Sequence, residues 1–169
     1  MIDFKYLSNY AIFKDLTDAE LEQIYSVLHF KSFQNGDKIF EEGERGEAMY
    51  ILLEGEIEIS KPLTLLKDKL GKVNRDNMAL IRLKQEDHPC VGEMVLFGDS
   101  DIRSATAIAI QASKFGVIEK DEFLQLAGSN SALGYKVMKN LARIMGERLK
   151  KANQDILKLT TAFTLALEE

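Results

Sequence analysis

The stretch GEMVLFGDSDIRSAT occupies residues 92–106 and carries the most specific pattern in the chain. It predicts a strand end, a glycine that frees the backbone, a short helical turn from Glu93, and Arg103 opening the next strand. Backbone N–H groups at a helix start bind anions, and a guanidinium forms paired hydrogen bonds to phosphate oxygens. A glutamate beside them accepts hydrogen bonds from ribose hydroxyls. Together these features predict a pocket for a phosphorylated sugar.

Short segments of alternating apolar and polar residues surround this stretch, from His29 to about Ala112, with glycines between them. Such alternation indicates strands, and the glycines indicate the tight turns of an antiparallel sheet. The predicted strands are 38–40, 49–53, 56–60, 79–83 and 106–110. One more strand is expected at 115–118, followed by a short helix at 120–126. Residues 63–77 read as a long hairpin excursion.

Helical signals flank the predicted β structure. Near the N-terminus, Thr17 and Glu20 fit a capping box, and apolar residues follow at helical spacing. Near the C-terminus, ten apolar positions alternate steps of three and four: Tyr135, Met138, Ala142, Met145, Leu149, Ala152, Ile156, Leu159, Phe163 and Ala166. We call these ten positions the seam. Heptad spacing of this kind is typical of a two-helix coiled coil.

A second apolar stripe on the C-terminal helix runs along Leu133, Val137, Leu141 and Ile144, and it stops at Arg148. It predicts that the helix packs on its own body early and on a second copy along the seam, which gives a homodimer. The alternative is a long helix lying across its own domain. We therefore expect an α+β chain of two parts, a β-roll with an N-terminal helical segment over 1–130 and a long dimerisation helix over 131–169.

Composition excludes several classes of function. Cys90 is the one cysteine, and His29 and His88 are the two histidines, so an intrachain disulfide, a multi-thiolate metal site and a multi-histidine centre are excluded. An enzyme of the cupin type needs such a histidine cluster, so we expect no enzyme and no cofactor. His88 and Cys90 as a metal or haem pair are the weaker interpretation. Without a long apolar run or an apolar signal core, we expect no membrane span and a cytoplasmic protein.

Charge is unevenly distributed along the chain. Residues 135–158 hold seven basic residues against two acidic ones, a net +5, while the whole chain carries −5. An acidic remainder opposes nonspecific nucleic-acid binding, which requires clustered lysine and arginine. We interpret the basic stretch as a solvated helix face and expect no direct DNA binding.

The segments 39–44, 49–59 and 92–106 together resemble the cyclic-nucleotide-binding domain family, and the chain is similar to it up to about Leu149. The resemblance implies an antiparallel, jelly-roll-like β-roll with a phosphate-binding cassette at 92–106. The step of ten residues from Glu93 to Arg103 looks more like bacterial catabolite activators than eukaryotic kinase regulatory subunits.

The resemblance also implies roles for individual residues. Glu93 would accept from the ribose 2′-hydroxyl, Arg103 would pair with the cyclic phosphate, and Ser104 would donate to the phosphate or contact the base. Gly92 and the N–H groups near Met94 and Val95 would complete the backbone cradle. Arg148 is a candidate for stacking on the purine. Because threonine in place of Ser104 more often accompanies guanine in the family, cAMP is expected over cGMP.

The expected function is a cyclic-nucleotide sensor that signals through its dimer helix to an unknown protein partner, without a DNA-binding or output domain. The alternative is a structural dimer with a degenerate pocket, because residues 85–91 depart from the family pattern before Gly92. For Arg103 the alternative is a surface ion pair with Asp99 or Asp101. Glu54 and Glu56 are candidates for orienting Arg103.

Overall fold

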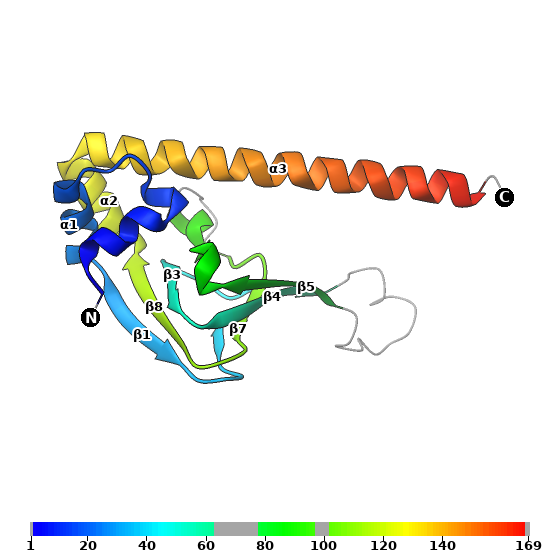
Figure 1. Ribbon diagram of the computed structural model, residues 1–169, viewed down its shortest axis with the longest axis horizontal. Helices are drawn as coiled ribbons and strands as arrows, with labels where there is room; N and C mark the ends of the chain where they lie inside the picture. The colour runs from blue at the N-terminus through cyan, green and yellow to red at the C-terminus, as the bar shows by residue number, and fades with distance from the viewer. Residues whose placement is uncertain (1, 63–77, 97–101, 168–169) are drawn as a thin grey trace.

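Two four-stranded antiparallel sheets packed face to face form the body of the computed structural model, which describes residues 2–62, 78–96 and 102–167 (Figure 1). One sheet has the strand order β1-β8-β3-β6 and the other β2-β7-β4-β5. The strands are β1 (His29–Phe33), β2 (Lys38–Phe40), β3 (Ala48–Glu54), β4 (Glu56–Pro62), β5 (Met78–Lys84), β6 (Cys90–Val91), β7 (Thr106–Ala109) and β8 (Ser113–Glu119). The antiparallel β-roll is confirmed.

Strand β3 lies between two separate hydrophobic cores. Tyr50 and Leu52 face the core between the sheets, whereas Met49, Ile51 and Leu53 face a second core beneath the helices. A strand covered on both faces has no polar side, and this explains why β3 is a nearly continuous apolar run rather than an alternating one.

Helices cover one end of the sheets. They are the 3-10 helices η1 (Phe4–Asn9) and η2 (Ala11–Phe13) and the α-helices α1 (Asp18–Ser26), α2 (Lys120–Ser129) and α3 (Ser131–Leu167). The predicted capping box is confirmed: Thr17 N–H donates to Glu20 Oε2 at 2.7 Å, and Glu20 N–H donates to Thr17 Oγ1 at 3.3 Å.

The first three turns of α3 are fixed to this helical end. Leu133, Val137 and Leu141 are buried, as the second apolar stripe predicts. Asn140 Nδ2 donates to the carbonyls of Ile12 at 3.1 Å and Lys14 at 2.7 Å. Beyond these turns α3 runs on past the body (Figure 1), and the side chains of its distal part are exposed in the single chain.

The structure departs from the predicted elements in a few places. Strand β1 was not predicted, because it is an edge strand whose first four side chains are exposed, so it has no apolar alternation to detect. His29 begins this strand, and its Nε2 lies 2.8 Å from Glu122 Oε2. The predicted excursion at 63–77 lies outside the described residues. None of the described helices is long and apolar enough to cross a bilayer.

Candidate ligand-binding site

A cavity of about 760 Å³ opens between the β-roll and α3, and all seven predicted site residues line it. They are Gly92, Glu93, Met94, Val95, Arg103, Ser104 and Arg148. The first four belong to the turn after β6, where Glu93–Leu96 form the 3-10 helix η6. The fold therefore brings residues from the cassette and from α3 around one space.

Arg103 lines this cavity and is 7% exposed. Its Nη2 donates to the carbonyl of Ala48 at 2.7 Å, and its Nη1 donates to that of Gly92 at 3.2 Å. The Phe40 ring centroid lies 4.5 Å from Cζ, a cation–π distance. Arg103 Nε is buried and has no hydrogen-bond partner within the part of the chain that the structure describes. No carboxylate of the described residues lies within ion-pair distance of this guanidinium.

The charge state of Arg103 makes this arrangement informative. Burial lowers the pKa of Arg103, and nearby Tyr50 and Glu44 act in the opposite direction. A guanidinium nevertheless remains protonated in proteins. Among the described residues this buried cation is held by carbonyls and a ring, which is costly unless an anion joins it. The site therefore fits an anionic ligand.

Two glycines make room for the Arg103 side chain. Gly92 has a φ of +72°, and a Cβ there would lie 2.4 Å from Arg103 Nη1. A Cβ on Gly46 would lie 2.0 Å from Arg103 Nε. Gly92 was predicted as part of the site, whereas Gly46 was predicted only as one of the turn glycines between strands. The sequence does not indicate that Gly46 lies beside Arg103, because the two residues are far apart in the chain.

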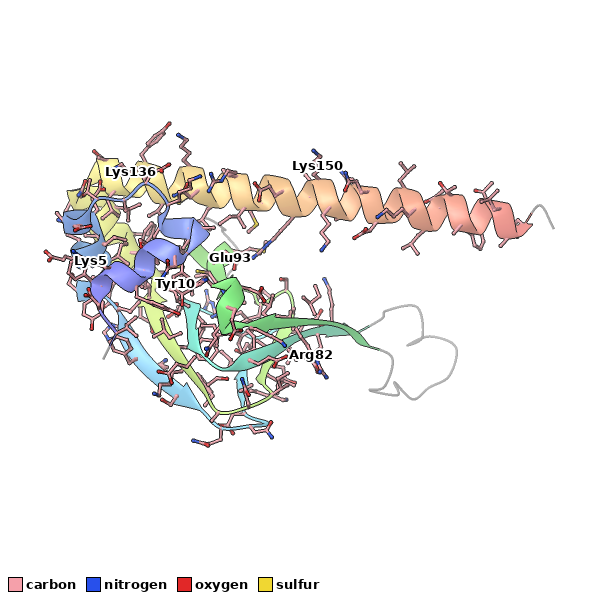
Figure 2. All side chains as sticks on the ribbon, in the orientation of Figure 1. Lys5, Tyr10, Arg82, Glu93, Lys136 and Lys150 are labelled. Carbon is pink, nitrogen blue, oxygen red and sulfur yellow. The ribbon has the colours of Figure 1, made fainter. Side chains whose placement is uncertain are left out.

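Glu93 also lines the cavity and links the cassette to α3. Its side chain, labelled in Figure 2, is buried, and its Oε1 accepts from Arg148 Nη1 at 2.5 Å. A carboxylate offers several acceptor positions, so the pair leaves capacity for a further donor. Arg148 therefore lines the cavity, and its guanidinium pairs with Glu93. Its stacking on a purine stays a prediction.

The backbone of the cassette differs in detail from the predicted cradle. Val95 N–H donates to the Gly92 carbonyl at 3.4 Å, so this amide is engaged within the turn. The Val95 side chain is buried, whereas that of Met94 is 51% exposed at the cavity mouth. Ser104 is exposed on the cavity wall, and β7 begins only at Thr106, after Arg103 rather than at it.

The sequence also predicted acidic partners for Arg103, and the structure gives Glu54 a different partner. Glu54 pairs with Lys114 at 2.8 Å, so its predicted role of orienting Arg103 is wrong. The residues of the alternative ion pair, Asp99 and Asp101, lie outside the described residues. Phe40 and Tyr50, whose rings flank the guanidinium, were not predicted as site residues because their strands look like ordinary core.

Cys90 and His88, the candidates for a metal or haem pair, are surrounded by aromatic and charged side chains. The described ranges contain no group of three or more potential ligands from histidine, cysteine, aspartate and glutamate. The His88 ring packs edge-on against Tyr10 at 5.2 Å between centroids. Burial raises the pKa of the Cys90 thiol, and Glu93 adds to this increase, which disfavours the reactive thiolate.

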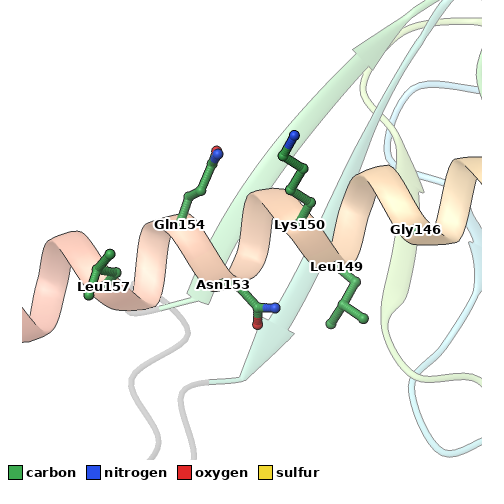
Figure 3. A pocket seen from close by; sticks show the side chains of 6 residues that line it. All are labelled: Gly146, Leu149, Lys150, Asn153, Gln154 and Leu157. Carbon is green, nitrogen blue, oxygen red and sulfur yellow. The ribbon is translucent and has the colours of Figure 1, made fainter.

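A second hollow, of about 400 Å³, lies on α3 itself (Figure 3). All of its lining residues belong to this helix: Gly146, Leu149, Lys150, Asn153, Gln154 and Leu157. Lys150 and Gln154 project to one side of the helix, and Leu149 and Asn153 to the other (Figure 3). This hollow is a shallow feature of an exposed helix surface and lacks the buried cation of the larger cavity.

A family model described as cyclic nucleotide-binding domain matches residues 30–130. The chain belongs to this family. Among curated proteins, it is 29% identical over 130 residues to the cAMP-activated global transcriptional regulator CRP of Salmonella typhimurium, a match covering 77% of this chain and 57% of that protein. It is 28% identical over 168 residues to human cGMP-dependent protein kinase 2, covering 96% of this chain and 20% of the kinase. The chain therefore spans little more than half of one relative and a fifth of the other.

Solved structures share the fold of this family member. The catabolite activator protein of Thermus thermophilus superposes with a TM-score of 0.71 at 23% identity, covering 89% of this chain and 63% of that one. A cyclic nucleotide-binding domain from Methylobacillus flagellatus gives a TM-score of 0.72 at 21% identity, covering 91% and 84%. These likenesses support the predicted fold of β-roll, N-terminal helices and long C-terminal helix.

Proposed function

We propose that this protein is a cyclic-nucleotide sensor that binds cAMP in the cavity between the cassette and α3. The observation that carries the proposal is the buried Arg103 guanidinium, whose Nε lacks a partner in a glycine-lined recess. A cyclic phosphate supplies the missing anion, and Glu93 accepts from the ribose 2′-hydroxyl. Ser104 favours adenine by its resemblance to family members that bind cAMP. The proposed role is regulatory and not enzymatic, in the cytoplasm.

The Glu93–Arg148 pair supplies the proposed route from ligand to output. A ribose hydroxyl that binds Glu93 shares this carboxylate with Arg148, and Arg148 belongs to α3. Ligand binding therefore changes the relative free energies of different orientations of α3 on the β-roll. Such a change is what couples the ligand site to the distal part of α3. The first turns of α3 stay fixed by Leu133, Val137 and Asn140, so the effect falls on the part beyond them.

The seam is the proposed dimer interface. Five of its large members are each exposed by more than 60% in the single chain: Tyr135 by 68%, Leu149 by 62%, Ile156 by 61%, Leu159 by 72% and Phe163 by 66%. Contiguous apolar exposure of this extent on a charged helix supports a second copy of α3 as its partner. In this proposal an unidentified protein partner responds to the dimer.

Calorimetry with cAMP and cGMP tests the proposed ligand. We expect wild type to bind cAMP, and Arg103→Ala to bind it about 100-fold more weakly, because the phosphate loses a buried charged partner. Arg143→Ala removes an exposed arginine from α3 and serves as the control, with unchanged affinity. No binding of either nucleotide, or an unchanged affinity in Arg103→Ala, contradicts the proposal. A thermal-shift screen without any stabilising nucleotide would favour the alternative, a structural dimer with a degenerate pocket.

A further inference from the structure

Aromatic side chains form a continuous row in the core between the two sheets, and this row ends at Arg103. Phe33 and Phe115 lie 5.5 Å apart between ring centroids in an edge-to-face contact. Tyr50 continues the row at 6.0 Å from Phe115, and Phe40 follows at 5.8 Å from Tyr50. The rings come from β1, β8, β3 and β2, which belong to both sheets. The packing of the whole β-roll therefore fixes the position of the last ring, Phe40.

Phe40 makes the closest ring contact with the guanidinium. Arg103 Cζ lies over the Phe40 ring at 4.5 Å from its centroid and over the Tyr50 ring at 5.7 Å. Phe40 and Arg103 are each 7% exposed, and both line the cavity. Cation–π attraction strengthens when the two partners are removed from water. The Phe40 ring is therefore a substantial partner of this buried cation.

An aromatic ring holds a cation in a different way from a carboxylate. It attracts the cation through its quadrupole and carries no net charge that would neutralise it. The carbonyls of Ala48 and Gly92 take two of the five N–H donors of a guanidinium, and the Nε donor of Arg103 has no partner among the described residues. The guanidinium is thus held in place while its charge and its Nε donor stay available to an anion.

We infer that Phe40 is a positioning residue for the ligand phosphate, because its ring holds the Arg103 guanidinium by cation–π attraction. This inference rests on the proposed function, since it takes the phosphate to bind at Arg103. An arginine side chain has many rotamers, and restricting them in advance removes an entropic cost from the binding step. Loss of the ring therefore weakens phosphate binding although Phe40 itself has no hydrogen bond to offer the ligand.

Calorimetry with cAMP on the full chain tests this role. Phe40→Leu keeps an apolar side chain but loses the ring, and we expect about five-fold weaker binding, the cost of ordering one long side chain. Phe40→Tyr keeps the ring face and should bind within about two-fold of wild type. Phe33→Leu is the matched control, because it removes a ring from the opposite end of the same row. Both leucine variants should lose stability in urea, but Phe33→Leu should keep the wild-type affinity.

Fluorinated phenylalanines at the same position separate cation–π attraction from packing. Adding one, two and then three fluorines to the Phe40 ring makes its face progressively less negative, with little change in shape. We expect the affinity for cAMP to fall step by step along this series, to about five-fold below wild type at its end. The same series at Phe33 should leave the affinity unchanged.

Two results would overturn the inference. One is a Phe40→Leu variant that binds cAMP as tightly as wild type. The other is an affinity that stays constant along the fluorinated series, since the ring would then act only through its shape. Either result leaves the proposed binding of the phosphate at Arg103 standing. If wild type binds neither cAMP nor cGMP, the proposed function fails and the inference fails with it.

Discussion

Gly46 and Arg103 pack so closely that a Cβ on the glycine would lie 2.0 Å from Arg103 Nε and 2.2 Å from Cζ. The two residues are far apart in the chain, and the contact exists only because the loop before β3 passes beside the cassette. The absence of a side chain at position 46 is therefore part of what positions the buried guanidinium.

Gly46→Ala is expected to displace the guanidinium from the carbonyls of Ala48 and Gly92 and to weaken cAMP binding by at least about ten-fold. Calorimetry measures this effect. Gly128→Ala is the matched control, because a Cβ at Gly128 meets nothing within 4 Å. In that control, affinity should stay unchanged while a helix-favouring alanine raises stability by about 0.5 kcal/mol. Wild-type affinity in Gly46→Ala would show that Arg103 tolerates another position.

The ion pair between Glu93 and Arg148 is expected to add about 1 kcal/mol of coupling free energy to the ligand-free protein. Glu93 is buried, but the Arg148 side chain is 56% exposed, so solvent screens the pair. Urea denaturation of Glu93→Gln, Arg148→Met and the double variant gives the coupling directly. A coupling near zero would mean that α3 is held to the cassette without this pair.

Acid should weaken the attachment of α3 to α1. Burial alone would raise the pKa of Glu20, but hydrogen bonds from Lys136 and Thr17 outweigh it and hold the pKa below the usual value. Lys136 Nζ lies 2.7 Å from Glu20 Oε2. A carboxyl whose pKa is lowered on folding stabilises the protein above its unfolded pKa of about 4.3, and this stabilisation is lost as pH falls through the folded value.

Glu20→Gln tests this linkage. The variant should be less stable than wild type by about 2 kcal/mol at pH 7, with the difference shrinking at pH values below about 4. Urea denaturation at a series of pH values follows the difference. If the difference in stability between the variant and wild type stayed constant at acid pH, the loss of stability would come from packing rather than from the charge of Glu20.

The seam is expected to govern association. Phe163 and Leu165 are two residues apart and are exposed by 66% and 60%, but only Phe163 belongs to the seam. Phe163→Asp should weaken the dimer by at least about ten-fold because it places a charge in an apolar interface, whereas Leu165→Asp should leave association unchanged. Sedimentation equilibrium measures both. Equal effects of the two substitutions would contradict the heptad assignment.

Several features could be predicted from the sequence because they depend on local patterns. The capping box of Thr17 and Glu20 needs only neighbouring residues. The strands between glycine turns follow from alternation, and the long α3 follows from sustained helical periodicity. The pattern of residues 92–106 predicted Arg103 and Glu93 as site residues from one local segment, and both line the cavity between the β-roll and α3.

Other features were decided only by the tertiary structure. The recess at Gly46, the rings of Phe40 and Tyr50 around Arg103, and the engagement of Arg148 by Glu93 all join residues that lie far apart in the sequence. The position of Asp155 in the cavity wall likewise depends on the direction in which α3 leaves the body. A local pattern specifies the type and period of an element, and therefore the residues that a turn presents. Which distant groups meet those residues is set by the packing of whole elements, because buried volume and hydrogen bonding must be satisfied across the fold at once.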